Sequence, residues 1–231
     1  MKPRIVQFLC LVIFCVLPSA LTYAQDTAET QFWPEIDVFI PLTPKTRLFL
    51  LGTITKAQET RSNVEGQFGA HLDYTINKKF MIRGGYRYGF SLSDGDPFKE
   101  HRIVLEQTVR QPLPLDVLLS DRNREDLRWV NGQFSARYRN RVTVERDFKV
   151  LGRQLTPYSS AEVYYDTRFD TWNRNRLTIG VQIPFKKGFP LISLVDPQRQ
   201  FVLDLYLTRQ NDSRSQPSRI KAFGSAFSIY F

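Results

Sequence analysis

The feature that most constrains this chain is a strict alternation of apolar and polar side chains from residue 64 to residue 92. One phase of the first half holds Val64, Phe68, Ala70, Leu72, Tyr74 and Ile76, and the same phase after Asn77-Lys78-Lys79 holds Phe80, Ile82, Tyr86, Tyr88, Phe90 and Leu92. A period of two places these side chains on one face of a β-strand, and no helix has that period. Each half spans about 13 residues, which is longer than a typical soluble strand and long enough to cross a bilayer at a tilt.

Nine further segments show the same pattern with varying clarity, and no long amphipathic helix competes with them. They are Glu35–Pro41, Arg47–Thr55, His101–Arg110, Arg122–Val130, Phe134–Glu145, Ser159–Arg168, Arg176–Phe185, Phe201–Leu207 and Phe223–Phe231. Eleven candidates conflict with the even strand number of single-chain bacterial barrels. We therefore expect an all-β chain that forms an antiparallel up-and-down transmembrane β-barrel of twelve strands, with ten as the alternative. A secreted soluble β-sandwich or lipocalin-like barrel would show similar alternation over shorter strands.

The chain ends on an aromatic strand. Phe223, Phe227, Ile229 and Phe231 share one phase, and the last residue is itself a phenylalanine. Chain termini are usually polar and loose, so an apolar end indicates a strand that pairs with the first one and closes the barrel. The pattern resembles the sorting signal read by the bacterial barrel-insertion machinery, which we expect as a partner during assembly.

The first 24 residues have the composition of a secretory signal peptide. Lys2 and Arg4 precede the apolar run Ile5–Leu17, and small residues lead to a cleavage site after Ala24. The run is short for a transmembrane helix. We expect the signal peptide to span residues 1–24 and the barrel to span residues 25–231. The expected location is the bacterial outer membrane, where the chain contacts lipid.

Composition narrows the functional classes. Both cysteines, Cys10 and Cys15, lie in the expected signal peptide, so a disulfide scaffold and a cysteine-based zinc site are excluded from the processed chain. The net charge of +9 is compatible with nucleic acid, but a secreted chain rarely meets that partner. We expect no cofactor, no metal and no nucleic acid; the pattern leaves the oligomeric state open.

Charged residues recur in the polar phase of the expected strands, which faces the lumen of a barrel. An electropositive cluster is expected from Arg124, Arg128, Arg137, Arg139 and Arg141, with counter-charges from Asp126, Glu162 and Asp166. Arginines and acids are nearly balanced over the whole phase, which favours an ion-paired and mostly filled lumen, because an unpaired charge at low dielectric is costly. The expected role is structural or small-ligand-binding. A narrow channel with anion preference is the alternative, with these arginines as the anion contacts.

The residues offer little catalytic chemistry. The two histidines are His71 and His101, and neither is followed two places later by a serine that a base could activate. The acids are scattered rather than paired in one motif. We therefore expect no catalytic residues and no enzyme; a lipid- or peptide-hydrolysing barrel is the weakest alternative.

Short arginine-rich motifs recur in a spaced order, ending on the phenylalanine strand. They are Arg87-Tyr88, Glu100-His101-Arg102-Ile103, Arg122-Asn123-Arg124-Glu125, Arg137-Tyr138-Arg139 and Arg174-Asn175-Arg176-Leu177. In this order the chain resembles the bacterial family named domain of unknown function 2490. The resemblance implies an outer-membrane β-barrel and offers no established activity, so it assigns no catalytic residue.

Overall fold

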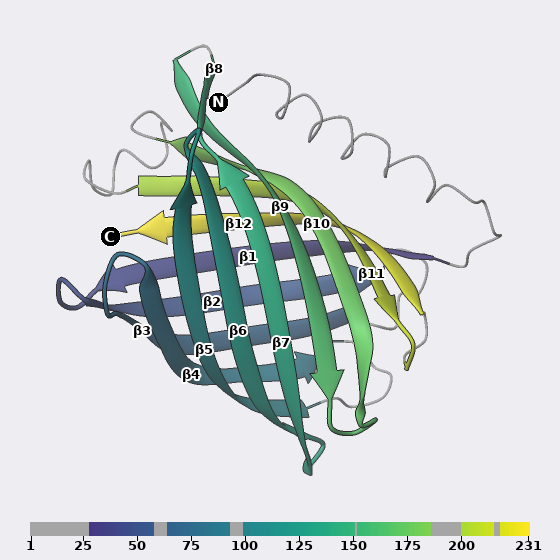
Figure 1. Ribbon diagram of the computed structural model, residues 1–231. Coiled ribbons are helices and arrows are strands. Elements are labelled where there is room, and N and C mark those ends of the chain that lie inside the picture. Colours follow the sequence, from purple (N-terminus) through teal and green to yellow (C-terminus); the bar gives the residue numbers. More distant parts are fainter. Residues whose placement is uncertain (1–27, 58–63, 93–98, 151, 186–199, 215–217) are drawn as a thin grey trace.

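The computed structural model describes residues 28–57, 64–92, 99–150, 152–185, 200–214 and 218–231, which form strands joined by turns (Figure 1). The expected signal peptide lies outside these residues. The strands are β1 (Glu29–Pro41), β2 (Thr46–Ala57), β3 (Val64–Thr75), β4 (Phe80–Ser91), β5 (Lys99–Leu113), β6 (Val117–Val130), β7 (Gln133–Arg146), β8 (Phe148–Val150), β9 (Arg153–Asp166), β10 (Thr171–Phe185), β11 (Gln200–Asp212) and β12 (Arg219–Tyr230).

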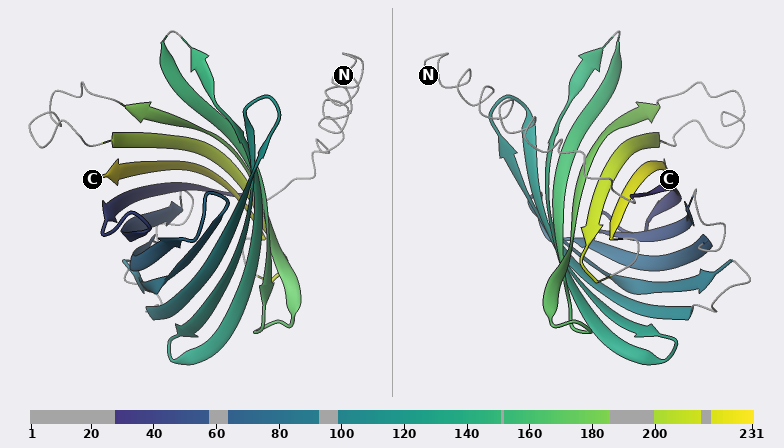
Figure 2. Two further views of the ribbon diagram at one scale, coloured as in Figure 1. Left: turned by 60° about the vertical axis from the view of Figure 1, so that its left-hand side comes forward. Right: turned by 90° about the vertical axis from the view of Figure 1, so that its right-hand side faces the viewer.

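Eleven of these strands close into a barrel, which confirms the all-β barrel (Figures 1 and 2). Each strand pairs with the next along the chain, β7 pairs with β9, and β12 pairs with β1 to complete the ring. The twelfth strand, β8, has three residues and stands outside the wall, where it pairs with the start of β9. In Figures 1 and 2 this hairpin extends beyond the barrel rim.

The closing pair differs from a fully antiparallel barrel. β1 and β12 run parallel, with Phe32 opposite Phe223 and Val38 opposite Ile229, whereas all other neighbours in the wall are antiparallel. The eleven segments found in the sequence are the eleven strands of the wall. An odd number of alternating strands makes the first and the last point the same way, so they can close the ring only in parallel. The even-number rule pointed away from this count because it assumes that both chain ends lie at the same rim.

The two faces of the wall have opposite chemistry. The outward phase exposes large apolar side chains, among them Leu72 (52% exposed), Leu177 (60%) and Ile179 (61%). The inward phase buries charges instead: Asp126 and Asp166 are both fully buried. A water-soluble barrel has the reverse arrangement, because its apolar phase fills the core. Among the described residues, no helix is long and apolar enough to span a membrane.

Apolar packing inside the barrel is confined to one part of the wall. Phe39 on β1 stacks on Phe49 on β2 with ring centroids 4.7 Å apart, and on Tyr230 of β12 at 4.6 Å. This aromatic cluster spans both sides of the closing pair. Elsewhere the lumen is filled by charged and polar side chains, and these make up the candidate site.

Candidate functional site

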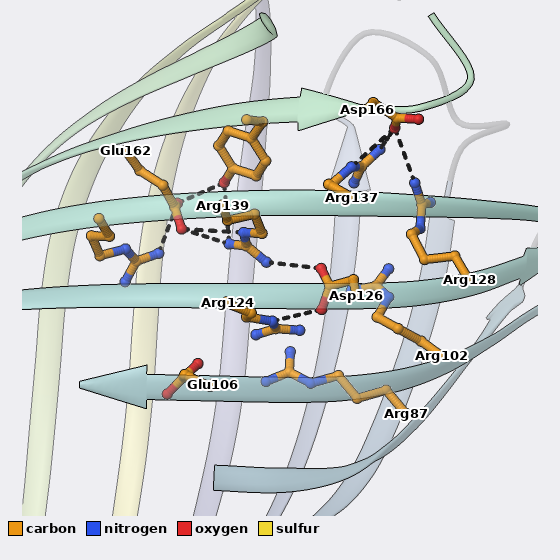
Figure 3. A network of polar contacts seen from close by, with 12 residues as sticks. Arg87, Arg102, Glu106, Arg124, Asp126, Arg128, Arg137, Arg139, Glu162 and Asp166 are labelled. Atoms are coloured by element: carbon orange, nitrogen blue, oxygen red, sulfur yellow. Dashed lines mark hydrogen bonds and ion pairs between the residues drawn. The ribbon is translucent and has the colours of Figure 1, made fainter. Parts of the chain in front are cut away.

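The lumen holds a cluster of arginines contributed by two adjacent strands (Figure 3). Alternate positions on a strand share a face, so β6 turns Arg124 and Arg128 inward, and β7 turns Arg137, Arg139 and Arg141 inward. The β6–β7 turn is the two-residue Asn131-Gly132, and both residues have positive φ, as a tight hairpin requires. This turn sets the register that places the two rows of guanidinium groups side by side.

Glu162 on β9 contacts two of these arginines, Arg139 and Arg141, and also Arg122 on β6. Its Oε1 accepts hydrogen bonds from Nη2 of Arg139 at 2.9 Å and from Nη2 of Arg122 at 3.1 Å. Its Oε2 accepts from Nη2 of Arg141 at 3.0 Å and from the Tyr164 hydroxyl at 2.6 Å. The carboxylate is almost fully buried. It neutralises arginines of β6 and β7 from its own position on β9, so one ion-pair centre connects three strands.

Asp166 forms a second centre at the end of β9. Its Oδ2 accepts from Nη2 of Arg137 at 2.7 Å, from Nη1 of Arg128 at 3.4 Å and from Nη2 of Arg168 at 2.8 Å. Arg168 lies in the turn beyond the strand, where its hydrogen bond to Asp166 raises the pKa of the guanidinium above its ordinary value. This centre ties β6, β7 and the β9–β10 turn together near one rim.

Asp126 is the third counter-charge. Its Oδ1 accepts from Nε of Arg124 at 2.7 Å, while Nη1 of Arg139 lies 3.8 Å from its Oδ2. The structure thus brings all three acids expected from the sequence within ion-pair distance of the expected arginine cluster. Tyr164 adds an aromatic contact, with the Arg139 guanidinium 4.7 Å from its ring centroid.

Sequence reasoning missed three members of the network. Arg122 contacts Glu162, Glu100 binds both Arg102 and Arg128, and Asp212 binds Arg174 at 2.5 Å. Glu100 and Asp212 lie just outside the predicted segments His101–Arg110 and Phe201–Leu207, so longer strand boundaries would have found them. Arg122 lies within its predicted segment, in the same phase as Arg124 and Arg128. Asp73 lies in the inward phase of β3 and joins β2 to β4 by accepting from Nε of Arg47 at 2.7 Å and from Nε of Arg83 at 2.5 Å.

The model of the family described as Protein of unknown function (DUF2490) matches residues 30–195, which covers β1 through β10 and most of the lumen network. The chain belongs to this family. No curated protein and no solved structure matches it. The family description carries no activity, so the chemistry of this member must be inferred from its own residues.

Arg87 lies among the paired charges of the lumen (Figure 3), but no acid of the described part of the chain lies within ion-pair distance of it. Arg87 on β4 points into the lumen beside Arg124 and Glu106 (Figure 3), and its Nε donates to Nε2 of His71 at 3.2 Å. His71 is buried and stacks on Phe49, with ring centroids 5.3 Å apart. The histidine therefore acts as a neutral acceptor for a buried guanidinium. This part of the lumen carries a local excess of positive charge.

The second histidine lies on the other face of the wall. His101 points outward, and its Nδ1 is 2.6 Å from the Tyr86 hydroxyl. The two histidines are therefore on opposite faces and form no common site. In the described residues, no group of three or more His, Cys, Asp or Glu side chains is arranged to hold a metal ion.

The residues of the expected assembly signal line the outward face beside the closing pair. Phe223 stacks on Phe32 of β1 at 5.7 Å, and Phe227 stacks on Phe201 of β11 at 5.7 Å. Ile229 follows in the same phase, opposite Val38. The backbone N–H of Phe231 donates to the carbonyl of Phe39 at 3.0 Å, so the last residue continues the parallel pairing beyond β12.

Proposed function

We propose that this protein is an outer-membrane β-barrel of a Gram-negative envelope, with a mostly filled lumen that serves a structural or small-ligand-binding role. The rim that carries Phe231 faces the periplasm in this proposal. The exposed apolar side chains of the outward phase support a lipid environment, because a water-facing wall would not present them all round. The signal-like segment at residues 1–24 and the aromatic last strand support export and insertion.

The main support for a filled lumen is that its buried acids are paired with arginines. Glu162, Asp166 and Asp126 are almost fully buried, and each lies within 4 Å of at least two guanidinium groups. An anion pore would instead leave arginines free along a wetted wall. Arginines held by fixed carboxylates cross-link the strands from within and leave the barrel without a continuous row of free charges.

A narrow channel with anion preference is the second candidate, and one observation favours it. Arg87 and the neighbouring Arg124 form a region of excess positive charge, in which Nη2 of Arg124 has no hydrogen-bond partner among the described residues. Guanidinium groups bind phosphate and carboxylate bidentately and stay charged at all relevant pH values. A small anion that entered the lumen would be held there.

Planar-bilayer recording of the purified protein tests the first proposal against the second. A filled barrel gives no unitary current; a channel gives small steps whose reversal potential in a salt gradient reports anion preference. The triple variant R137A/R139A/R141A should lower thermal stability in the first case and reduce anion preference in the second. Mobility that differs between boiled and unboiled samples in electrophoresis establishes that each preparation is a folded barrel. A cation-selective wild-type current would contradict both candidates.

The proposal includes no catalytic role. A barrel that hydrolyses lipids or peptides would need an activated nucleophile, and neither His71 nor His101 lies in a hydrogen bond with a serine in the described structure. Incubation of the purified protein with labelled phospholipid and with a labelled peptide mixture checks this part directly. Turnover of either substrate would overturn it.

A further inference from the structure

A cleft lies at the rim opposite Phe231, where β9 and β11 end and β10 and β12 begin. It has a volume of about 690 Å³, far more than a single phosphate needs. Its lining combines an exposed indole, two serines and two asparagines that face each other across strands: Trp172, Asn175, Asn211, Ser213 and Ser218. Exposed aromatic rings and amide groups of this kind suit a ligand that carries hydroxyl groups.

The amides of the cleft have unused acceptor capacity. Asn211 donates from Nδ2 to Oδ1 of Asn175 at 2.9 Å, but its own Oδ1 has no hydrogen-bond partner in the described part of the chain. Oδ1 of Asn173, at the bulge between Trp172 and Arg174, is also without a donor there. Buried polar atoms are normally hydrogen-bonded, so these two oxygens are acceptors that a donor group on a ligand can use.

Two cations stand side by side just below the cleft. Arg209 on β11 and Lys221 on β12 are directly opposite each other on the outward face, one row of residues deeper than Asn211 and Arg219. Both side chains are exposed. Like charges directly opposite in a sheet destabilise it, and neither residue has an acidic partner among the described residues. The pair therefore places two cations side by side, and the described part of the chain supplies no counter-charge for them.

The acids near this site are engaged elsewhere. Asp212 lines the cleft, but its carboxylate accepts from Nε of Arg174 at 2.7 Å and from Nδ2 of Asn173 at 3.1 Å. On the neighbouring β1, Glu29 is buried in the inward phase, and the outward positions are Thr30 and Phe32. No carboxylate of the described outward face competes for the two cations.

The next row deeper is entirely apolar. Ile179, Leu207 and Phe223 lie in register across β10, β11 and β12, and all three are more than 40% exposed. From the rim inward, the first row holds Asn175, Asn211 and Arg219, and the second holds Leu177, Arg209 and Lys221. The surface thus changes from polar to apolar within three rows, or roughly 14 Å along the strands. A free anion would need only the middle row.

We propose that this site binds the headgroup of a phosphorylated glycolipid. A phosphate lies between Arg209 and Lys221. The sugar occupies the cleft against Trp172, and its hydroxyls donate hydrogen bonds to Oδ1 of Asn173 and Oδ1 of Asn211. The acyl chains follow Leu207 and Phe223. The inference rests on the proposed membrane location, because only a lipid uses all three rows at once. It assigns a specific lipid-binding role to a part of the barrel remote from the lumen cluster.

Native mass spectrometry of the folded protein in detergent tests the site, with diphosphorylated lipid A as the probe and phosphatidylcholine as the zwitterionic control. We expect lipid A to be retained, and we expect R209A/K221A to weaken its binding roughly tenfold or more. The matched variant K78A/K79A removes two exposed lysines from the opposite rim, with the same change in charge, and should bind like the wild type. W172A should weaken lipid A but leave phosphatidylglycerol unaffected.

Equal lipid A binding by R209A/K221A and K78A/K79A would overturn the site. Equal retention of phosphatidylglycerol and lipid A would overturn the sugar assignment, and displacement by inorganic phosphate at equal concentration would identify a soluble-anion site instead. If R209A/K221A fails to fold, R209Q/K221Q replaces it. Heat-dependent mobility of the wild type separates the two proposals: a folded barrel that retains no lipid A refutes only this inference, whereas a protein without such mobility refutes the membrane barrel itself.

Discussion

Arg139 on β7 donates two hydrogen bonds to a single carboxylate oxygen of Glu162 on β9, from Nη2 at 2.9 Å and from Nε at 3.2 Å. The same carboxylate also accepts from Arg122 and Arg141, and Nη1 of Arg176 lies 3.8 Å from it, so its removal would leave four partly buried guanidinium groups around one missing charge. Breaking a buried ion pair by removing one partner typically costs about 3–5 kcal/mol.

We therefore expect Glu162→Gln to lower the free energy of unfolding in detergent by about that amount. Urea titration followed by electrophoretic mobility measures it. Glu125→Gln is the matched control, because Glu125 is an exposed outward carboxylate on β6 with no arginine partner among the described residues. Equal losses in the two variants would mean that the lumen network is not a main source of stability.

The outward phase should tolerate charge only near the rims. Leu72 lies in the outward phase of β3 and is 52% exposed, so Leu72→Arg should cost about 2–4 kcal/mol in a bilayer. Ile76 lies one residue past the same strand, beside the Asn77-Lys78-Lys79 turn, and Ile76→Arg should cost at most about 1 kcal/mol. Unfolding in lipid vesicles measures both. If Leu72→Arg is neutral, that face meets water rather than lipid.

The parallel closing pair predicts two engineered disulfides. Phe32 faces Phe223, and Val38 faces Ile229, so each pair replaced by cysteines should cross-link under mild oxidation. An antiparallel β1–β12 pair could satisfy at most one of the two, because the second would then lie several residues out of register. Non-reducing electrophoresis reports the cross-links. The swapped combination of Phe32→Cys with Ile229→Cys serves as the negative control.

A polar patch interrupts the outward apolar face on β6 and β7. Asn140 donates from Nδ2 to Oδ1 of Asp121 at 2.7 Å and to Oδ1 of Asn123 at 3.0 Å, and Glu125 lies next to them. Glu125 is four residues from Trp129, about 13 Å along the strand. Glu125→Leu should therefore raise the unfolding temperature in lipid by about 2–4 °C, which calorimetry can measure. A lower unfolding temperature would show that the carboxylate has a partner.

Removal of the last residue should impair assembly. Deleting Phe231 removes an apolar side chain at the rim and the hydrogen bond from its N–H to Phe39, so the closing pair loses its final contact. We expect outer-membrane levels to fall at least several-fold, measured by fractionation and immunoblotting, with degradation in the periplasm. Phe231→Tyr keeps both the ring and the backbone bond and should assemble normally. Unchanged levels of the deletion variant would refute the assembly role.

Much of the candidate site follows from strand phase alone. Arg137, Arg139 and Arg141 occupy every second position of one segment, and the sequence therefore predicts that they face the lumen together. Strand phase does not predict which acid on another strand each arginine contacts. Arg122 shares the phase of Arg124 and Arg128, but its partner Glu162 lies on β9, two strands away from β6 in the wall, and strand phase says nothing about contacts at that distance.

By itself, the sequence determined the strands, their two faces and the aromatic end of the chain. Alternation is a local property of an extended backbone, so each segment shows it without reference to any other. Only the tertiary structure decided that eleven strands close the wall with β1 parallel to β12, that Glu162 collects arginines from several strands, and that Arg209 lies opposite Lys221 below a cleft. Each of these depends on register and ring closure between segments distant in the chain, and no local pattern encodes how far one strand is displaced along its neighbour.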